Sequence, residues 1–132
     1  MTGVADTRLL IAWAFPPNVE TKLRIADFLE KEISKCLLAP TITLTEFIEI
    51  AGTNIGEDAA QNKIQLLKGK GMKTVSIDEE KAIAAGSLLL AHRNIPIADA
   101  LIASIVKIGI GEYVITDDPH FKELRVKTKW LC

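Results

Sequence analysis

Short apolar segments alternate with longer helical patterns along this chain, and that alternation is the feature that most restricts its fold. Each apolar segment spans only a few residues, which is typical of a buried strand. Strands separated by helices pair in parallel, and a parallel sheet needs helices on both faces. The sequence therefore predicts an α/β fold. The expected strands are residues 3–5, 37–39, 73–77 and 113–116, with a short edge strand within 126–131.

Helices are expected between these strands. Asn18 is a candidate N-cap for a long amphipathic helix, because apolar residues follow it at steps of three and four. Gly52 is expected to end one helix and Asn54 to cap the next. The last long helix is nearly apolar, so we expect it to be deeply packed. The expected helices are 8–15, 18–35, 43–51, 55–68, one that starts after Ser76 or Asp78 and ends near Arg93, and 97–108.

Composition excludes several classes of protein. The 132 residues are 48% hydrophobic and 25% charged, which is typical of one globular domain covering residues 1–132. The net charge of -1 makes nonspecific attraction of nucleic acid weak, so such binding needs a local patch. Cys36 and Cys132 form no CxxC pair, which argues against a disulfide scaffold or a zinc site. The sequence shows neither a membrane-length apolar run nor a signal-peptide pattern, so we expect a cytoplasmic protein.

Acidic residues follow the expected strands or begin the expected helices. Asp6 follows the first strand, and Asp117 and Asp118 follow the fourth. Glu46 is expected in the first turn of the helix after the second strand, and Asp99 in the first turn of the nearly apolar helix. The carboxyl ends of parallel strands and the starts of the helices share one edge of the sheet. The sequence therefore predicts that these acids converge.

Converging carboxylates have a specific chemical consequence. Like charges raise one another's pKa, and a hard divalent cation removes that repulsion. Oxygen ligands favour Mg²⁺ or Mn²⁺ over zinc. Sites of this type hydrolyse phosphodiester bonds. The sequence contains neither a phosphate-binding GxxxxGK[ST] loop nor a recognisable Ser/His/Asp arrangement that would offer another chemistry.

Each acid also has a structural interpretation. Helix capping, the helix dipole and a turn each account for one of these positions without any metal. On the residues alone, both interpretations stay open. The alternatives are a capping box at 43–46, a dipole contact for Asp99, an N-cap at Asp6 and a turn at 117–119.

Four segments together resemble a known family. Residues 4–7 (VADT), followed by Leu9, Leu10 and Ile11, resemble the opening strand, acid and helix of PIN-domain proteins. Residues 43–46 (TLTE) resemble the second acidic motif, and 97–103 (IADALIA) the third, which is the most specific. Residues 114–121 (VITDDPHF) resemble the closing motif. The four segments follow the family's order and span almost the whole chain.

The resemblance implies a three-layer α/β/α sandwich around a parallel, Rossmann-like sheet. It implies Mg²⁺- or Mn²⁺-dependent cleavage of single-stranded RNA. Among small members, the chain most resembles the VapC-like toxins of toxin–antitoxin pairs, which are commonly homodimers blocked by an antitoxin protein. An RNA substrate, a cognate antitoxin and a second copy are therefore the expected partners.

The resemblance also assigns roles to single residues. It places Asp117 as an additional metal ligand. A basic stretch flanks the closing motif, so we expect RNA contacts at Lys122, Arg125 and Lys127, although such residues commonly form a solvated surface. The expected catalytic and metal-binding residues are Asp6, Glu46, Asp99 and Asp118, with Thr116 as the hydroxyl residue that orients the site.

Two residues depart from the family pattern. His120 stands where a further Asp is common, and we expect it on a surface loop. Arg8 stands where Asn is common, and it is expected to pair with Asp6 and compete with metal. These departures motivate an alternative, a PIN-like binding or regulatory protein with weak or no catalysis. A phosphate-transfer domain is a third hypothesis, which the Arg at position 8 disfavours because such sites use a second Asp there.

Overall fold

A parallel sheet lies at the centre of the computed structural model, which describes residues 1–131. Within that range the sheet has five strands in the order β3-β2-β1-β4-β5, and every pairing is parallel. The central strand aligns Val4 with Leu38 on one side and with Val114 on the other. The predicted α/β class with a parallel sheet is confirmed. The strands are β1 (Gly3–Ala5), β2 (Leu37–Pro40), β3 (Lys73–Val75), β4 (Tyr113–Ile115) and β5 (Thr128–Lys129).

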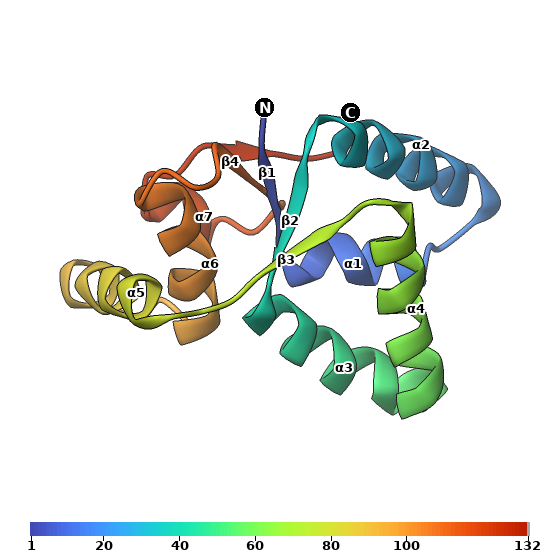
Figure 1. The fold of residues 1–132 in the computed structure, drawn as a ribbon, viewed down its shortest axis with the longest axis horizontal. Helices are drawn as coiled ribbons and strands as arrows, with labels where there is room; N and C mark the ends of the chain where they lie inside the picture. Colours follow the sequence, from blue (N-terminus) through green and yellow to red (C-terminus); the bar gives the residue numbers. More distant parts are fainter. Residues whose placement is uncertain (132) are drawn as a thin grey trace.

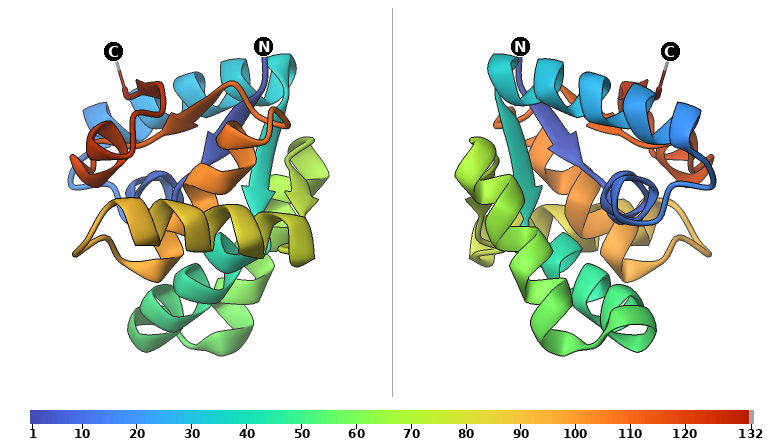
Figure 2. Two further views of the ribbon diagram at one scale, coloured as in Figure 1. Left: turned by 90° about the vertical axis from the view of Figure 1, so that its left-hand side faces the viewer. Right: turned by 90° about the vertical axis from the view of Figure 1, so that its right-hand side faces the viewer.

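Helices cover the sheet on both sides, which confirms the three-layer α/β/α arrangement. In Figure 1, α1, α2, α3 and α4 lie to the right of the strands, and α5, α6 and α7 lie to the left. Figure 2 shows the same two layers from the sides. The helices are α1 (Thr7–Ala14), α2 (Val19–Lys35), α3 (Thr41–Ile55), α4 (Glu57–Lys70), α5 (Glu79–Ala91), α6 (Ile97–Lys107) and α7 (His120–Glu123).

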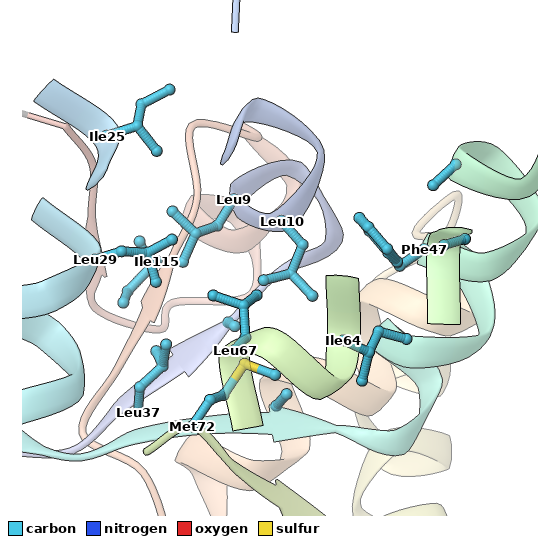
Figure 3. Close-up of a cluster of buried hydrophobic side chains, with 14 of the residues drawn as sticks. Leu9, Leu10, Ile25, Leu29, Leu37, Phe47, Ile64, Leu67, Met72 and Ile115 are labelled. Carbon is cyan, nitrogen blue, oxygen red and sulfur yellow. The ribbon is translucent and has the colours of Figure 1, made fainter. Parts of the chain in front are cut away.

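Side chains that alternate along β1 and β4 build two hydrophobic cores. Ala5, Tyr113 and Ile115 belong to the core beneath α1, α2 and α4, part of which Figure 3 shows. Val4 and Val114 point to the other face and pack with α6 and α7. This alternation is the expected consequence of the two-residue repeat of a strand. Because all five residues are buried, the two central strands are fixed in depth and register.

The predicted break between the third and fourth helices was wrong. Gly52 does not end a helix, because α3 continues to Ile55 and the Gly52 carbonyl accepts a hydrogen bond from the Gly56 amide at 2.9 Å. Asn54 lies inside α3 and donates to the Ile50 carbonyl. The break falls at Gly56, whose φ of 89° is a conformation that favours glycine. The core contacts of α3 override the weak helix propensity of Gly52.

Other predicted boundaries differ by a few residues. The helix predicted from Arg8 begins at Thr7, and Asp6 is its N-cap. The N-cap of α5 is Asp78 rather than Ser76, because the Asp78 side chain accepts from the Lys81 amide. Asn18 caps α2 as predicted. Among the helices within residues 1–131, none is both long and apolar enough to cross a bilayer.

Candidate metal-binding active site

An open cavity of about 440 Å³ lies at the carboxyl edge of the central strands. Asp6 directly follows β1 and begins α1, while Asp117 and Asp118 lie just beyond β4. Asp99 lies in the first turn of α6, and Glu46 lies further along α3 than predicted, in its second turn. The structure therefore brings the predicted acids to one cavity. Its lining comprises Asp6, Thr7, Arg8, Ile11, Ala12, Glu46, Ile50, Asp99, Asp117, Asp118 and Trp130.

Asp6 is the most buried of these acids, with 3% of its surface exposed. Its Oδ1 accepts the Thr7 amide at 2.8 Å, and its Oδ2 accepts the Thr116 hydroxyl at 2.7 Å. Burial raises the pKa of Asp6 to about 6, and the charges of Asp99 and Asp118 act in the same direction. The two hydrogen bonds oppose that rise without cancelling it. Asp6 therefore caps α1 and also lies close to two other acids, whose charges disfavour its ionisation.

Two threonine hydroxyls fix Glu46 relative to β1. The Thr7 hydroxyl donates to Glu46 Oε1 at 2.5 Å. The Thr43 hydroxyl lies inside α3 and donates to the Ala5 carbonyl at 2.9 Å, which joins this helix to β1. The alternative that residues 43–46 form a capping box was therefore wrong, since α3 begins at Thr41. Glu46 instead points toward the cavity edge that Asp6 occupies.

Asp99, Asp118 and His120 form the tightest group in the site. His120 Nδ1 lies 2.8 Å from Asp99 Oδ2 and 3.2 Å from Asp118 Oδ1. One ligand atom from each of the three residues falls within 4.8 Å of the others. The hydrogen bond to Asp99 raises the pKa of His120, and burial raises the pKa of Asp99. The expectation that His120 belongs to a surface loop was wrong, because α7 places its ring between two acids.

The Thr116 hydroxyl links the ends of β1 and β4. It donates to Asp6 and accepts the Asp118 amide at 3.0 Å. The Asp118 carboxylate in turn accepts the His120 amide at 3.0 Å. The Thr116 hydroxyl group therefore contacts both acids.

Arg8 pairs with the two acids that follow β4. The predicted pair between Arg8 and Asp6 was therefore wrong. The Arg8 guanidinium lies 2.9 Å from Asp117 Oδ1 and 3.8 Å from Asp118 Oδ2. The hydrogen bond to Asp117 raises the pKa of Arg8 further. Both partners of the closer pair are about half exposed, so this ion pair lies at the rim of the cavity. Asp117 is thus held by an arginine, whereas Asp6 is held by neutral donors.

The predicted basic residues lie beside the site rather than within it. Lys122 is on α7, and Arg125 and Lys127 follow in the segment that leads to β5. All three side chains are exposed. Lys107 on α6 approaches the same segment and donates to the Arg125 carbonyl. This arrangement gives an exposed basic surface next to Asp118 in the chain.

The donor set fits a divalent cation. Carboxylates from β1, α6 and the end of β4 share one cavity, and burial holds the pKa of Asp6 well above its ordinary value of 3.8. A cation would remove the repulsion that contributes to this rise. Oxygen donors are the ligands that Mg²⁺ and Mn²⁺ prefer. The residues that would hold it are Asp6, Asp99 and Asp118, with Glu46 in the same cavity lining.

The sequence matches the family model of the PIN domain over residues 4–127. This chain belongs to the PIN-domain family. That membership covers all the acids described above, and it confirms the family resemblance of the four motifs. No curated protein matches the sequence significantly.

Solved structures with the same fold include VapC-type chains. One is a chain of VapBC2 from Rickettsia felis bound to promoter DNA, with a TM-score of 0.80, 14% identity and full coverage of both chains. Another is VapC20 from Mycobacterium tuberculosis, a toxin that cleaves the sarcin-ricin loop, with a TM-score of 0.77, 12% identity and coverage of 94% and 95%. FitAcB from Neisseria gonorrhoeae matches at 0.70 with 19% identity and coverage of 96% and 95%. The protein is therefore VapC-like in fold.

Sequence reasoning missed the contact between His120 and Asp99. The signal was closeness along the chain, because His120 lies two residues after Asp118. It also missed the apolar wall of the cavity. Trp130, at the far end of the chain, lies on that wall with Ile11 and Ile50.

Proposed function

We propose that this chain is a divalent-metal-dependent endoribonuclease that cleaves single-stranded RNA, acting as the toxin of a toxin–antitoxin pair. The observation that carries the proposal is the convergence of Asp6, Asp99 and Asp118 on one cavity in a PIN-domain chain. VapC20, which has the same fold, is itself described as a sarcin-ricin loop cleaving toxin. The proposed place of action is the cytoplasm, and the proposed cation is Mg²⁺ or Mn²⁺.

The chain's own residues prepare this site in three ways. Thr116 and the Thr7 amide hold both oxygens of Asp6, so that carboxylate is oriented before any ligand arrives. Glu46 is held by the Thr7 hydroxyl and can accept a proton from an attacking water at the cavity edge. A divalent cation bound by the acids supplies Lewis-acid stabilisation of the charge that develops on the phosphodiester. Arg8 at the rim offers a further positive charge to the RNA backbone.

RNA cleavage with defined metals tests the proposal. Fluorophore-labelled single-stranded RNA of random sequence should be cut in Mn²⁺ or Mg²⁺ and left intact in EDTA. Asp6→Asn and Asp99→Asn should each slow cleavage by about 10²–10³-fold, because each removes charge from a preorganised site. Asp58→Asn, at an exposed position on α4, is the matched control. Full activity in the two site variants would contradict the proposal.

The basic surface beside the site is the proposed RNA contact. Lys122, Arg125 and Lys127 are exposed and lie within ten residues after Asp118 in the chain. Replacing any one of them with Ala should weaken RNA binding for all sequences alike and reduce the salt dependence of binding by about one counterion. Fluorescence anisotropy at several salt concentrations measures both quantities. Unchanged binding in all three variants would remove this surface from the proposal.

An antitoxin and a second copy of the chain are the proposed protein partners. Several solved structures with this fold are toxin–antitoxin complexes, including one from Klebsiella pneumoniae. Ile83, Leu90 and Ile97 expose apolar side chains on α5 and at the start of α6, where a second copy can cover them. Light scattering should give twice the chain mass of 14.4 kDa, and Leu90→Asp should halve it. Addition of a cognate antitoxin protein should suppress RNA cleavage.

A PIN-like binding or regulatory protein is the second candidate. The observation that favours it is the neutralisation of site acids by the chain itself, through Arg8 on Asp117 and His120 on Asp99. Calorimetric titration of the whole chain with Mg²⁺ and Mn²⁺ separates the two candidates. Heat of binding at micromolar to millimolar metal supports the nuclease, and none at millimolar metal supports the binding protein.

A further inference from the structure

The histidine at position 120 places a nitrogen atom at the point where the carboxylates of the proposed metal site meet. Its Nδ1 lies 2.8 Å from one oxygen of Asp99 and 3.2 Å from one oxygen of Asp118. Neighbouring ligands of a six-coordinate metal ion lie about 3 Å apart, given metal–ligand distances near 2.1 Å. The spacing of the imidazole from the two carboxylates is therefore that of ligands around one ion.

The backbone around His120 is anchored to the rest of the site. Its amide donates to Asp118 Oδ1 at 3.0 Å, so the residue is tied to the acid that it faces. The next residue, Phe121, is fully buried, and Leu124 at the end of α7 is fully buried as well. These two anchors fix α7 against the core that contains α6, the helix that carries Asp99. The fold therefore fixes the backbone from which the partly exposed His120 ring reaches Asp99.

We propose that Nδ1 of His120 is a metal ligand beside the carboxylates of Asp99 and Asp118, and that this nitrogen makes the site bind Mn²⁺ more tightly than Mg²⁺. The inference rests on the proposed function, since it names the metal preference of that same site. Mg²⁺ binds oxygen donors and keeps its waters, whereas Mn²⁺ begins the transition-metal series, in which affinity for nitrogen-containing sites rises toward the later metals. Metal binding requires the imidazole tautomer with its proton on Nε2, and any proton on Nδ1 passes to the solvent.

The charge of the site points in the same direction. At position 120 an imidazole ring stands in place of the further carboxylate that would strengthen an all-oxygen magnesium site. In addition, the Arg8 guanidinium lies 3.8 Å from the second carboxylate oxygen of Asp118 and partly neutralises that acid. Both features weaken a purely electrostatic attraction for Mg²⁺ and leave relatively more of the affinity to the metal–nitrogen bond. Affinity for Co²⁺ should exceed that for Mn²⁺, as the usual order of divalent metals predicts.

Electron spin echo spectroscopy of the Mn²⁺-loaded chain tests the nitrogen directly. The chain has two histidines, so labelling all histidine with ¹⁵N changes the nuclei at two positions only. We expect ¹⁴N modulation of the Mn²⁺ signal in unlabelled protein, its replacement by ¹⁵N modulation on labelling, and its loss in His120→Asn. His92→Asn is the matched control, because His92 follows α5 outside the cavity lining, and it should keep the modulation.

Calorimetry adds a second measurement that does not depend on activity. The wild-type chain should bind Mn²⁺ at least about tenfold more tightly than Mg²⁺, and His120→Asp should reduce that ratio toward one by restoring an oxygen ligand. Thermal unfolding of both variants checks that they are folded.

The outcomes separate this inference from the proposed function. Mn²⁺ binding and RNA cleavage without histidine modulation would overturn the nitrogen ligand and leave the nuclease intact. Equal affinity for Mn²⁺ and Mg²⁺ in the wild type would overturn the metal preference in the same way. Absence of any metal binding, together with absence of cleavage, would overturn both.

Discussion

Two buried carboxylates, Glu32 and Asp6, occupy environments of opposite character. Glu32 on α2 is 1% exposed and accepts the Tyr113 hydroxyl at 2.5 Å and the Lys129 ammonium at 2.8 Å. Burial acts to raise the pKa of Glu32, but the bonds from Lys129 and Tyr113 outweigh it and leave the pKa lowered. Glu32 therefore joins α2 to β4 and β5 as an ion with its own partners inside the fold.

Asp6 is almost as buried, yet its close partners are a hydroxyl and an amide, and its charged neighbours are acids. Burial and the charges of Asp99 and Asp118 hold the pKa of Asp6 near 6. The Glu32 carboxylate is neutralised by a lysine of the same chain, so we expect it to stabilise the folded state. The Asp6 carboxylate lies close to other carboxylates, so we expect it to destabilise the folded state until a cation binds. This contrast is the expected trade-off between stability and activity.

The largest expected effect is the loss of the Glu32 carboxylate. Glu32→Ala should lower the free energy of unfolding by about 3 kcal/mol, because it leaves the Lys129 ammonium and the Tyr113 hydroxyl without their acceptor. Urea unfolding measures the loss. Glu30→Ala, at an exposed position on the same helix, should change stability by less than about 0.5 kcal/mol. Similar losses in the two variants would show that Glu32 is not the structural carboxylate of the pair.

The opposite change is expected at Asp6. In metal-free buffer at pH 7, Asp6→Asn should raise the free energy of unfolding by about 1–2 kcal/mol. Removing a carboxylate whose pKa is raised from 3.8 to about 6 can increase the free energy of unfolding by at most about 3 kcal/mol. The weaker hydrogen bonds of Asn should reduce that gain by about 1 kcal/mol. Asp27→Asn, at an exposed ion pair on α2, should have almost no effect. A loss of stability in Asp6→Asn would contradict the claim that the Asp6 carboxylate destabilises the metal-free fold.

The two carboxylates should also respond to pH in different windows. Between pH 3.8 and about 6, folded Asp6 keeps a proton that the unfolded chain has released, so its contribution to stability falls as pH rises. The advantage of Asp6→Asn should therefore be absent near pH 3.5 and complete above pH 7. Glu32 has a lowered pKa, so its contribution is complete above its ordinary value of 4.5 and is lost only at lower pH. Urea unfolding from pH 3.5 to 7.5 measures both profiles, and a Glu32→Ala penalty that changes between pH 5 and 6 would contradict this assignment.

The smallest expected effects come from removing one hydroxyl donor at each carboxylate. Tyr113→Phe and Thr116→Val should each lower the free energy of unfolding by about 1 kcal/mol. Thr116→Val should also raise the pKa of Asp6 further, because the lost bond favours the ionised form. Carbon-13 NMR titration of the Asp6 carboxyl group measures that change. No shift of the Asp6 titration would mean that Thr116 does not orient this acid.

The sequence could predict what local pattern and topology decide. Asp6, Asp99 and Asp118 meet because parallel strands end at one edge, and that rule needs only their places along the chain. It could not predict which partner Arg8 chooses, since Asp6, Asp117 and Asp118 are all within its reach. The role of Glu32 could not be predicted, because the inward face of α2 is recognised in the sequence by apolar residues such as Ile25 and Leu29. Its partners lie 81 and 97 residues away, so only the folded structure brings them together.

Trp130 on the cavity wall gives this molecule an optical sensor of its own. The sequence holds two tryptophans, and the other, Trp13, lies under the Lys63 ammonium and is not among the residues that line the cavity. A Trp13→Phe variant would emit from Trp130 alone. Paramagnetic Mn²⁺ bound in the cavity would quench that emission. RNA bound over the cavity would shift the wavelength of the emission. Occupancy of the site could then be followed in real time, without any label attached to either molecule.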